Sequence, residues 1–519
     1  MSSAHGSVER AGNRGRGPSG ALAGLIALAV FLGIAELVAI ATGPDTAPSI
    51  AIGQNAIAHT PEWLKEFAIR HFGENDKHVL LAGIYSTLAL LSALAGAAGA
   101  ATRRAVTVGA IAALGVAASI SAATYPTGTI VSVGPSLAGA VVAAYAFCVL
   151  VKDRPNPSRP TLDNRSRRQV LGLGGAVLAG GAAAYVIGRV GLQSAYNAIA
   201  SRTAVAFPKA SSPLPSAGGK TGFNVPGLSS YITPNTSFYR VDTALVVPQI
   251  NTSDYRLSIH GMVDNPATYT YDDILAMPLV ERAITLCCVS NPVGGPYIGN
   301  AVWLGALLKP LLARAGVSPD ADQLFMTSSD GMTIGADLRA ATDGRDAMLA
   351  VGMNGVPLPF EHGFPVRMVI PGEYGYVSAC KWLVDIDVTT YEARQAYWVP
   401  RGYSAQAPVK LESRIDTPRG GSHVEAGLVP VAGVAWRQHV GISRVQVSVD
   451  GGDWNDATLA AVDSPDTWRL WKWDWQATPG SHRLQVRATD AQGNVQVATP
   501  TPDFPNGATG WDTIEVTVT

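Results

Sequence analysis

Long apolar runs dominate the first third of the chain, and short alternating runs dominate the remainder. Four apolar runs are long enough to cross a bilayer as helices, and a fifth, richer in Gly and Ala, follows them. Their approximate bounds are residues 21–42, 79–101, 105–123, 130–151 and 170–190. Almost no charged residue interrupts them, so we expect a membrane domain of five transmembrane helices over residues 1–190 rather than a large soluble core.

Positively charged residues flank these runs in three segments that share one side of such a domain. They are Arg10, Arg14, Arg16, Arg103, Arg104, Lys152, Arg154, Arg159, Arg165, Arg167 and Arg168. Because an excess of Lys and Arg stays on the cytoplasmic side, we predict a cytoplasmic N-terminus. Five crossings then place everything after residue 190 on the outer face of the cell membrane.

The stretch "SRRQVL" at residues 166–171 resembles a twin-arginine export signal followed by a weakly apolar segment. Ordinary positive charge on the cytoplasmic side explains it equally well, so both interpretations stay open. None of the nine histidines lies in the middle of an apolar run, so we predict no haem within the membrane. In the loop at residues 43–78, "TPEWLKEFAIRHFG" indicates an amphipathic helix lying on the membrane surface.

A Pro/Ser/Gly-rich linker at residues 191–224 leads to a region of ordinary soluble composition. Over residues 225–405, strand-like runs alternate with turns and with short helical patterns such as Leu304–Gly316, which predicts an α+β fold with a mixed sheet. Residues 406–519 alternate as strands, with a hairpin signal at Asp450-Gly451-Gly452, and predict an all-β sandwich. The tryptophans of this last region are expected to pack in its core or at an interface, namely Trp454, Trp468, Trp471, Trp473 and Trp475.

Composition narrows the possible partners. The formal net charge of the 519 residues is −1, so the chain carries no overall basic field and we predict no nucleic-acid partner. Four cysteines in a chain of this length do not form a disulfide framework. Cys148 lies in an apolar run and reads as a small buried hydrophobe.

Cys287 and Cys288 stand side by side in "ITLCCVSNPVGG", between an apolar run and a Pro/Gly-rich turn. Neighbouring side chains of a strand point to opposite faces, so we expect one of them to be packed and the other to face the loop. A thiolate at a strand end suits a soft metal ligand or a catalytic nucleophile. Two buried structural cysteines remain the third interpretation.

The stretches "TLCCVSNPVGG" and "MNGVPLPFEHGFPVRMVIPGEYGYVSACKWL" resemble the molybdopterin-binding domain of the sulfite oxidase family. The family pattern has a Cys, two residues and an Asn, followed later by Asn-Gly, Pro-Leu, His-Gly-Phe-Pro with Arg, Pro-Gly and Lys-Trp. "TPNTSFYRVDTALVVP" resembles the segment in which the family's chain first meets the pterin. The resemblance covers about residues 225–400 and implies an oxidoreductase with molybdenum held by molybdopterin.

The resemblance also implies roles for individual residues. Cys288, which precedes Asn291 at the family spacing, becomes the metal ligand, and the catalytic residues become Cys288, Tyr391 and Tyr397, with Tyr403 in the same region. The residues assigned to the cofactor are Asn235, Tyr239, Arg240, Cys288, Thr327, His362, Arg367, Ser378, Ala379, Cys380 and Lys381. Among these, Arg367 and Lys381 are the cations expected at the phosphate.

Two departures from the family change the expected function. Pro292 and Val293 stand where sulfite oxidases carry arginines that hold the anionic substrate, so an uncharged substrate such as a sulfoxide or N-oxide fits better. The sequence lacks a Cys-x-x-Cys-His haem attachment site, so we predict a separate redox partner.

We therefore expect a membrane-anchored oxidoreductase that transfers oxygen atoms outside the cytoplasm. The last region resembles the immunoglobulin-like dimerisation domain of the family, which implies a homodimer. Small-molecule substrate, redox partner and membrane lipid are the remaining expected partners. The alternatives are a non-catalytic membrane scaffold that retains the fold and a thiol enzyme that uses Cys287 or Cys288.

Overall fold

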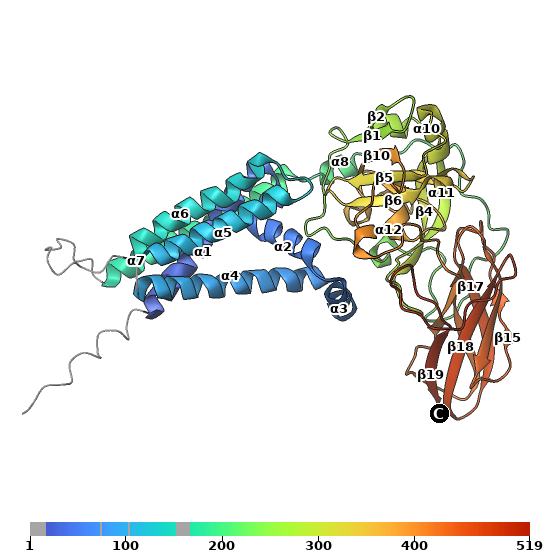
Figure 1. Ribbon diagram of the computed structural model, residues 1–519. Coiled ribbons are helices and arrows are strands. Elements are labelled where there is room, and N and C mark those ends of the chain that lie inside the picture. Colours follow the sequence, from blue (N-terminus) through green and yellow to red (C-terminus); the bar gives the residue numbers. More distant parts are fainter. Residues whose placement is uncertain (1–16, 73–74, 102–103, 152–166) are drawn as a thin grey trace, which may run out of the picture. The chain divides into compact units, whose positions relative to one another are not determined.

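The computed structural model describes residues 17–72, 75–101, 104–151 and 167–519. The chain divides into two compact units, shown in Figure 1. The first is Met1–Asn197 with Thr243–Val247, and the second is Ala198–Asp242 with Pro248–Thr519.

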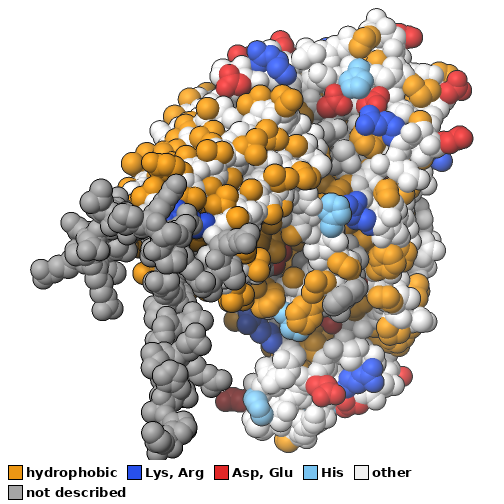
Figure 2. Space-filling model, turned by 60° about the vertical axis from the view of Figure 1, so that its left-hand side comes forward, with side chains coloured by type: hydrophobic (Ala, Val, Ile, Leu, Met, Phe, Trp, Pro, Cys, Tyr) orange, Lys and Arg blue, Asp and Glu red, His pale blue; other side chains and the backbone are white. Residues whose placement is uncertain are grey.

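Apolar helices make up the first unit. Among the described residues, five helices are long and apolar enough to cross a membrane, and Figure 2 shows hydrophobic side chains gathered over this unit. They coincide with the five apolar runs of the sequence, which are confirmed as helices. Their bounds are α1 (Gly17–Thr42), α4 (Asp76–Ala101), α5 (Arg104–Thr124), α6 (Gly134–Leu150) and α7 (Arg167–Ala195).

Most of the charges behind the orientation prediction lie outside the described residues. They are Arg10, Arg14, Arg16, Arg103, Lys152, Arg154, Arg159 and Arg165. Ser166, which opens the twin-arginine stretch, also lies outside them. The orientation and the export signal therefore stay predictions.

Helix α1 packs against α4, α6 and α7. Small residues bring the backbones close together, because a Cβ on Gly24 would collide with the carbonyl oxygen of Ser92 in α4. A Cβ on Gly33 would likewise collide with the carbonyl oxygen of Gly181 in α7. Such contacts between small residues are typical of helices that associate within a membrane.

Two shorter helices, α2 (Pro48–His59) and α3 (Glu62–Phe72), follow α1. Helix α3 confirms the helix expected in "TPEWLKEFAIRHFG". Its side chains Leu64, Phe67 and Phe72 are 40%, 47% and 40% exposed. Its position at a membrane surface stays a prediction.

Two sheets build the first part of the second unit. One has the order β2-β1-β10-β5-β6, with β1 and β10 parallel and the other neighbours antiparallel, so the predicted mixed sheet is confirmed. The other has the order β3-β4-β7-β8, with β9 on β7. The strands are β1 (Arg256–Gly261), β2 (Ala267–Thr270), β3 (Leu279–Cys287), β4 (Ile298–Leu307), β5 (Gln323–Ser328), β6 (Thr333–Asp337), β7 (Met348–Met353), β8 (Val356–Pro357), β9 (Arg367–Val369) and β10 (Leu383–Thr389). The helices among them are α8 (Ile199–Thr203), α9 (Tyr271–Leu275), α10 (Leu308–Ala315), α11 (Leu338–Thr342) and α12 (Gly375–Ser378).

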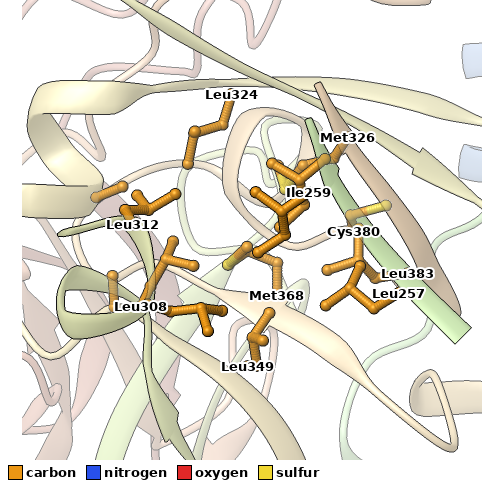
Figure 3. Packing of buried hydrophobic residues seen from close by; sticks show 14 of the residues in the cluster. Leu257, Ile259, Leu308, Leu312, Leu324, Met326, Leu349, Met368, Cys380 and Leu383 are labelled. Atoms are coloured by element: carbon orange, nitrogen blue, oxygen red, sulfur yellow. The ribbon is translucent and has the colours of Figure 1, made fainter. Parts of the chain in front are cut away.

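Apolar side chains from both sheets form one core, part of which Figure 3 shows. Ile259 of β1 and Met326 of β5 come from the mixed sheet, and Leu349 of β7 and Met368 of β9 come from the other. The side chain of Cys380 lies in the same core.

The predicted helical pattern at Leu304–Gly316 is wrong in its first turn. Strand β4 continues to Leu307, and α10 begins only at Leu308. Leu304 and Ala306 pair with β3 and β7, where both are buried. Apolar runs of this length fit a buried strand and a buried helix equally well, and sheet pairing decides between them.

The C-terminal region is a sandwich of two sheets, ordered β11-β13-β17-β16 and β12-β19-β18-β14-β15. Side chains from both sheets share one core. The predicted hairpin is present, because β14 pairs with β15 across the turn that contains Asp450 and Gly451, both at positive φ. The strands are β11 (Glu412–Thr417), β12 (His423–Val424), β13 (Gly427–Trp436), β14 (Ile442–Val449), β15 (Asn455–Asp456), β16 (Thr458–Leu459), β17 (Arg469–Ala477), β18 (Gly480–Asp490) and β19 (Asp512–Val518). An immunoglobulin-like topology stays a prediction.

The tryptophans of the sandwich fall into two groups. Trp471 and Trp475 are buried in its core and Trp473 packs against that core, as expected. Trp454 is only partly buried, and its ring meets that of Trp511 at 4.8 Å between centroids.

A third cluster, which we call the shared core, joins the sandwich to the sheet of β3 and β4. Its buried members are Cys287, Val289, Ile298, Tyr374, Val377, Tyr403, Ala407, Val409, Val434, Trp436, Ala460, Trp468 and Leu470. Val434, Trp436 and Leu470 come from the sandwich, and Cys287 and Ile298 come from the other sheet. The two parts of the second unit are therefore packed as one body.

Candidate active site

Cys287 and Cys288 stand at the end of β3. Cys287 is the last residue of the strand, lies opposite Ile298 of β4, and is fully buried in the shared core. Cys288 follows the strand and is 9% exposed, and its backbone N–H donates to the carbonyl oxygen of Tyr297 at 2.9 Å. The two thiols therefore have different surroundings, which is the arrangement expected if only one faces the loop.

The loop after Cys288 is held by its own hydrogen bonds. The backbone N–H of Asn291 donates to the carbonyl oxygen of Cys288 at 3.1 Å, and the backbone N–H of Tyr297 donates to Asn291 Oδ1 at 2.8 Å. Asn291 is 2% exposed, and its Nδ2 has no hydrogen-bond acceptor among the described residues. A buried donor without an acceptor is unusual and costs free energy. The loop thus presents an unused amide donor three residues after Cys288.

Burial raises the pKa of the Cys288 thiol to about 11, although hydrogen bonds with Ser290 act in the opposite direction. Asp503, from the sandwich, raises the pKa further, and Lys381 lowers it. Without a metal, this thiol stays protonated near neutral pH. That property does not favour a free thiolate nucleophile, whereas a bound cation would stabilise the thiolate directly.

The sandwich holds the same loop from outside. Arg414 of β11 donates from Nη1 to the carbonyl oxygen of Gly295 at 2.8 Å. Its Nε pairs with Asp416 at 2.7 Å, and its Nη2 donates to Ser229 Oγ at 3.1 Å. Sequence reasoning missed this residue, because no motif connects residue 414 to a loop more than a hundred residues earlier.

Gly294 allows a second contact between the loop and the sandwich. Its φ is +74°, and a Cβ there would collide with Oδ1 of Asp512. The other oxygen of that carboxylate accepts a hydrogen bond from the backbone N–H of Ile415 at 2.8 Å. A glycine is therefore required at this position by both backbone conformation and space.

Asn235 and His362 lie together in the described structure. His362 Nε2 is 3.3 Å from the carbonyl oxygen of Asn235, and Asn354 Nδ2 donates to Asn235 Oδ1 at 2.7 Å. Burial, assisted by the positive charges of Arg367 and Lys381, lowers the pKa of His362 to about 4. A neutral imidazole is therefore expected here at neutral pH.

Arg367 is a buried cation without a carboxylate partner. Its side chain is 5% exposed, and among the described residues no carboxylate lies within ion-pair distance of it. Its Nη1 donates to the carbonyl oxygen of His362 at 3.1 Å, and its guanidinium lies 5.0 Å from the ring centroid of Trp303. Burial lowers its pKa to about 10. Buried charges are normally paired, so this residue is placed to meet an anion from outside the protein.

Two further predicted cations meet at one carboxylate. Lys381 Nζ lies 2.6 Å from Asp242 Oδ2, and Arg240 Nε lies 2.8 Å from the same oxygen. Asp242 is 6% exposed in its side chain, and it was not among the residues assigned from the sequence. The two basic side chains are thus brought together from segments far apart in the chain.

Tyr239 lies near both cysteines and near Arg367. Burial raises its pKa well above the ordinary value, and the nearby thiols of Cys288 and Cys287 add to that shift. A Cβ on Gly375, the first residue of α12, would lie 3.8 Å from the Tyr239 hydroxyl and 3.7 Å from the carbonyl oxygen of Cys287. The start of α12 therefore lies beside the end of β3.

In the segment Ser378–Lys381, several polar groups already form hydrogen bonds within the protein. Ser378 Oγ donates to the carbonyl oxygens of Glu373 and Tyr374, both at 3.0 Å. Ala379 O accepts from Arg367 Nη2 at 3.4 Å, and the Cys380 side chain is buried in the core. Any contact of Cys380 with a cofactor would involve its backbone only.

Two of the predicted tyrosines are connected through Trp398, whose ring centroid lies 5.0 Å from that of Tyr397 and 5.2 Å from that of Tyr403. Tyr403 belongs to the shared core with Cys287, whereas Tyr391 and Tyr397 lie outside that cluster. The Tyr391 hydroxyl is buried without a hydrogen-bond partner among the described residues. The backbone N–H of Tyr397 donates to Thr333 Oγ1 at 3.0 Å. Thr327 lies in β5, opposite Asp385 and Thr333.

Within the described ranges, no three His, Cys, Asp or Glu side chains gather in a way that could hold a metal ion. A metal at Cys288 therefore needs most of its ligands from a bound cofactor. The surroundings suit such a cofactor, because Arg367 lacks a counter-charge and Asn291 offers an unused donor. The unpaired guanidinium and the unused amide donor fit an anionic organic group.

Comparisons with known proteins agree with this chemistry. Residues 244–398 match the family model described as an oxidoreductase molybdopterin binding domain. The mitochondrial sulfite oxidase of Mus musculus is 32% identical over 321 residues, which are 52% of this chain and 58% of that protein. The sulfite oxidase of Gallus gallus is 30% identical over 318 residues, which are 51% of this chain and 68% of that protein.

A solved structure of the sulfane dehydrogenase SoxCD from Paracoccus pantotrophus is 25% identical. It covers 55% of this chain and 81% of that chain, with a TM-score of 0.48. The chain spans little more than half the length of the mammalian sulfite oxidases it matches.

Proposed function

Because the chain belongs to the sulfite oxidase family of molybdopterin-dependent oxidoreductases, we propose that it is a membrane-anchored enzyme that transfers an oxygen atom to or from an uncharged substrate. Cys288 is the proposed metal ligand, and Cys287 is a packing residue. The single observation that carries the proposal is the buried guanidinium of Arg367, which has no carboxylate partner among the described residues.

The residues that would hold the cofactor form two groups. Cys288 would supply a thiolate to the metal, and Arg367 would meet the phosphate or another anionic part of the pterin. Arg240 and Lys381, already held together by Asp242, would offer further positive charge. When bound, the molybdenum centre supplies the two-electron redox change that oxygen-atom transfer requires.

The chain's own residues prepare the substrate side. Asn291 Nδ2 would donate a hydrogen bond to the substrate oxygen, which would satisfy its missing acceptor. The loop that carries it is fixed by Arg414, so the donor does not need to be ordered at the moment of reaction. These residues orient the substrate and exclude water, and they supply no electrons.

An uncharged substrate is favoured by the residues after Asn291. Pro292 and Val293 carry no charge, and the guanidinium nearest the loop on the sandwich side, Arg414, is neutralised by Asp416. A sulfite dianion would lose its hydration here without gaining a paired cation. A sulfoxide or N-oxide presents one polar oxygen, which a single amide donor can satisfy.

Anchoring through the helical unit is part of the proposal. Among the described residues, five helices have the length and composition to cross a membrane. The segments before the first run, between the second and third runs, and before the fifth run carry eleven Lys and Arg residues, whereas the loop at residues 43–78 carries only Lys65, Arg70 and Lys77. The second unit would then lie outside the cytoplasm, and a homodimer through the C-terminal sandwich is part of the same proposal.

Metal analysis of the detergent-purified full chain tests the proposal. We expect about one molybdenum and one pterin per chain, and reduction of a sulfoxide or N-oxide by an artificial electron donor. Protein free of molybdenum after expression in a molybdenum-supplied host that loads other molybdopterin enzymes would overturn it. That result would favour a scaffold that keeps the fold without the chemistry.

A further inference from the structure

A polar cluster lies inside the helical unit, among otherwise apolar side chains. Arg189 of α7 places Nε 3.3 Å from Glu36 Oε1 of α1. The same Nε is 3.3 Å from the hydroxyl of Tyr185, and Nη2 is 3.3 Å from the hydroxyl of Tyr85 in α4. Tyr85 also donates to Ser49 Oγ of α2 at 3.0 Å. Four helices thus contribute to one hydrogen-bonded group, which we call the Glu36 cluster.

Close helix packing creates the cluster. Gly188 precedes Arg189, and a Cβ at Gly188 would lie 2.7 Å from the Cβ of Glu36. The missing side chain lets α7 approach α1 at this point and sets Arg189 over the carboxylate. Tyr85 and Tyr185 then meet at 3.1 Å between their hydroxyl oxygens.

The carboxylate is not satisfied by its neighbours. Glu36 is fully buried, and within the described structure neither of its oxygens accepts a hydrogen bond. A buried ion pair with an unsatisfied oxygen contributes little to stability, and removal from water makes it costly. Ionisable residues within membrane helices mark functional sites more often than structural ones. The missing element at Glu36 is a hydroxyl that could donate to it.

An apolar surface leads to the cluster. Tyr85, Tyr185 and Arg189 are only partly buried. On α7, Val186 and Val190 flank Arg189 and are each 59% exposed. A ligand dissolved in lipid could therefore place its head against Tyr85, Tyr185 and Arg189, which separate Glu36 from the surface, while its apolar part stays against the exposed valines.

We propose that the Glu36 cluster binds the polar head of a membrane-dissolved quinol. The ring hydroxyl of a quinol would donate to the free carboxylate oxygen of Glu36, and its second oxygen could accept from Arg189. A phospholipid head fits less well, because Arg189 is already paired with Glu36 and a phosphate would add negative charge beside that carboxylate.

The ligand class also suits the proposed function, on which this inference rests. Reduction of a sulfoxide to a sulfide and water consumes two electrons and two protons. Oxidation of one quinol to a quinone releases two electrons and two protons, so the two half-reactions balance. Glu36 is placed to receive one proton as the ring O–H bond breaks. The quinol would then be the separate redox partner that the sequence analysis predicts.

Binding of decylubiquinol and decylubiquinone to the purified full chain in detergent tests the inference. Isothermal titration should give one saturable site per chain. Glu36→Gln should weaken quinol binding by about tenfold or more, because it removes the charged acceptor. Tyr85→Phe should weaken quinol binding less than Glu36→Gln does. If Glu36→Gln fails to fold, the Tyr85→Phe variant provides the test.

Two matched variants serve as controls. Tyr145→Phe removes a hydroxyl from α6 at a site that is 72% exposed, and it should leave the dissociation constant unchanged. Cys288→Ser should abolish molybdenum binding and leave quinol binding intact, so failure of the proposed function and failure of this inference are distinguishable. Uptake that does not saturate, or equal affinity in Glu36→Gln and the unmodified chain, would overturn the quinol site. Displacement of the quinol by anionic phospholipid would also overturn it, in favour of a lipid site.

Discussion

The guanidinium of Arg414 and the carbonyl oxygen of Gly295 are joined by a hydrogen bond of 2.8 Å. The loop that begins at Cys288 is therefore fixed by the sandwich as well as by its own sheet. Because Asn291 lies in this loop, the position of its amide donor depends on a residue that contacts no reacting atom.

Replacing Arg414 should therefore impair both the loop and the fold. We expect Arg414→Met to lower kcat/KM by about tenfold and the free energy of unfolding by about 1.5–3 kcal/mol, the usual value of a hydrogen bond to a charged group. Arg444→Met is the control, since its pair with Asp456 is 54% and 61% exposed and is screened by solvent, so its loss should change stability little. Steady-state kinetics and calorimetry of the two variants check the difference, and equal effects would contradict the positioning role.

The adjacent cysteines should respond in opposite ways. Cys288→Ser should eliminate bound molybdenum and activity while the protein stays folded. Cys287→Ser should keep molybdenum but lower stability by about 1–3 kcal/mol, because it places a hydroxyl in the shared core. Elemental analysis and thermal unfolding of both variants decide the assignment, which fails if Cys287→Ser is the variant that loses the metal.

Arg367 should be required for loading of the cofactor. Arg367→Lys keeps the positive charge but loses the planar guanidinium that can grip an anion with two N–H groups. We expect molybdenum and pterin content to fall severalfold, with little change in α-helix and β-sheet signals. Arg339→Lys, at an exposed position of α11, should load normally. Full loading of Arg367→Lys would remove this residue from the proposed site.

Glu412 should make stability depend on pH. Burial raises its pKa from 4.5 to about 8, so folding favours the protonated form. The contribution of Glu412 to the free energy of unfolding is fully present below pH 4.5, where the carboxyl is protonated in both states. It declines as this carboxyl ionises in the unfolded chain, and it is lost once the pH passes about 8. Each pKa unit corresponds to 1.36 kcal/mol, so the total effect is about 3–5 kcal/mol.

Glu412→Gln should therefore raise the melting temperature at pH 8.5 and change it little at pH 4.5. Glu515→Gln, at an exposed position of β19, should have little effect at either pH. Thermal unfolding of the full chain at the two pH values measures both. A Glu412→Gln variant that is destabilised at pH 8.5 would show that the ionised carboxylate has a partner in the fold.

The sequence predicted helices and strands best where the hydrophobic residues of a segment follow one clear pattern, either a long apolar run or a strict alternation. The five apolar helices, the mixed sheet and the hairpin at Asp450 all follow from such patterns. The apolar pattern at Leu304–Gly316 did not show where the strand ends and the helix begins. Leu304 is buried because it pairs with strands that are distant in the sequence. Tertiary pairing of this kind leaves no local signal.

The candidate site was predictable only where one motif holds several of its residues. Cys288, Asn291 and Arg367 lie within the quoted stretches, so the resemblance to the family supplied them. Arg414 and Asp512 reach the same loop from the sandwich, through contacts that only the fold creates. The Glu36 cluster likewise combines side chains from four helices. In the sequence, each of these side chains stands alone among apolar residues, so no local pattern indicates that they meet.

The shared core means that the C-terminal sandwich is not an interchangeable module. Trp436 and Leu470 of the sandwich and Cys287 and Ile298 of the other sheet are all buried in this one cluster. A chain cut near residue 405 would leave an apolar surface at the end of β3, next to the loop that begins at Cys288. Limited proteolysis of the native enzyme should therefore not release the sandwich as a separate fragment, and gene fusions that exchange it should yield insoluble protein.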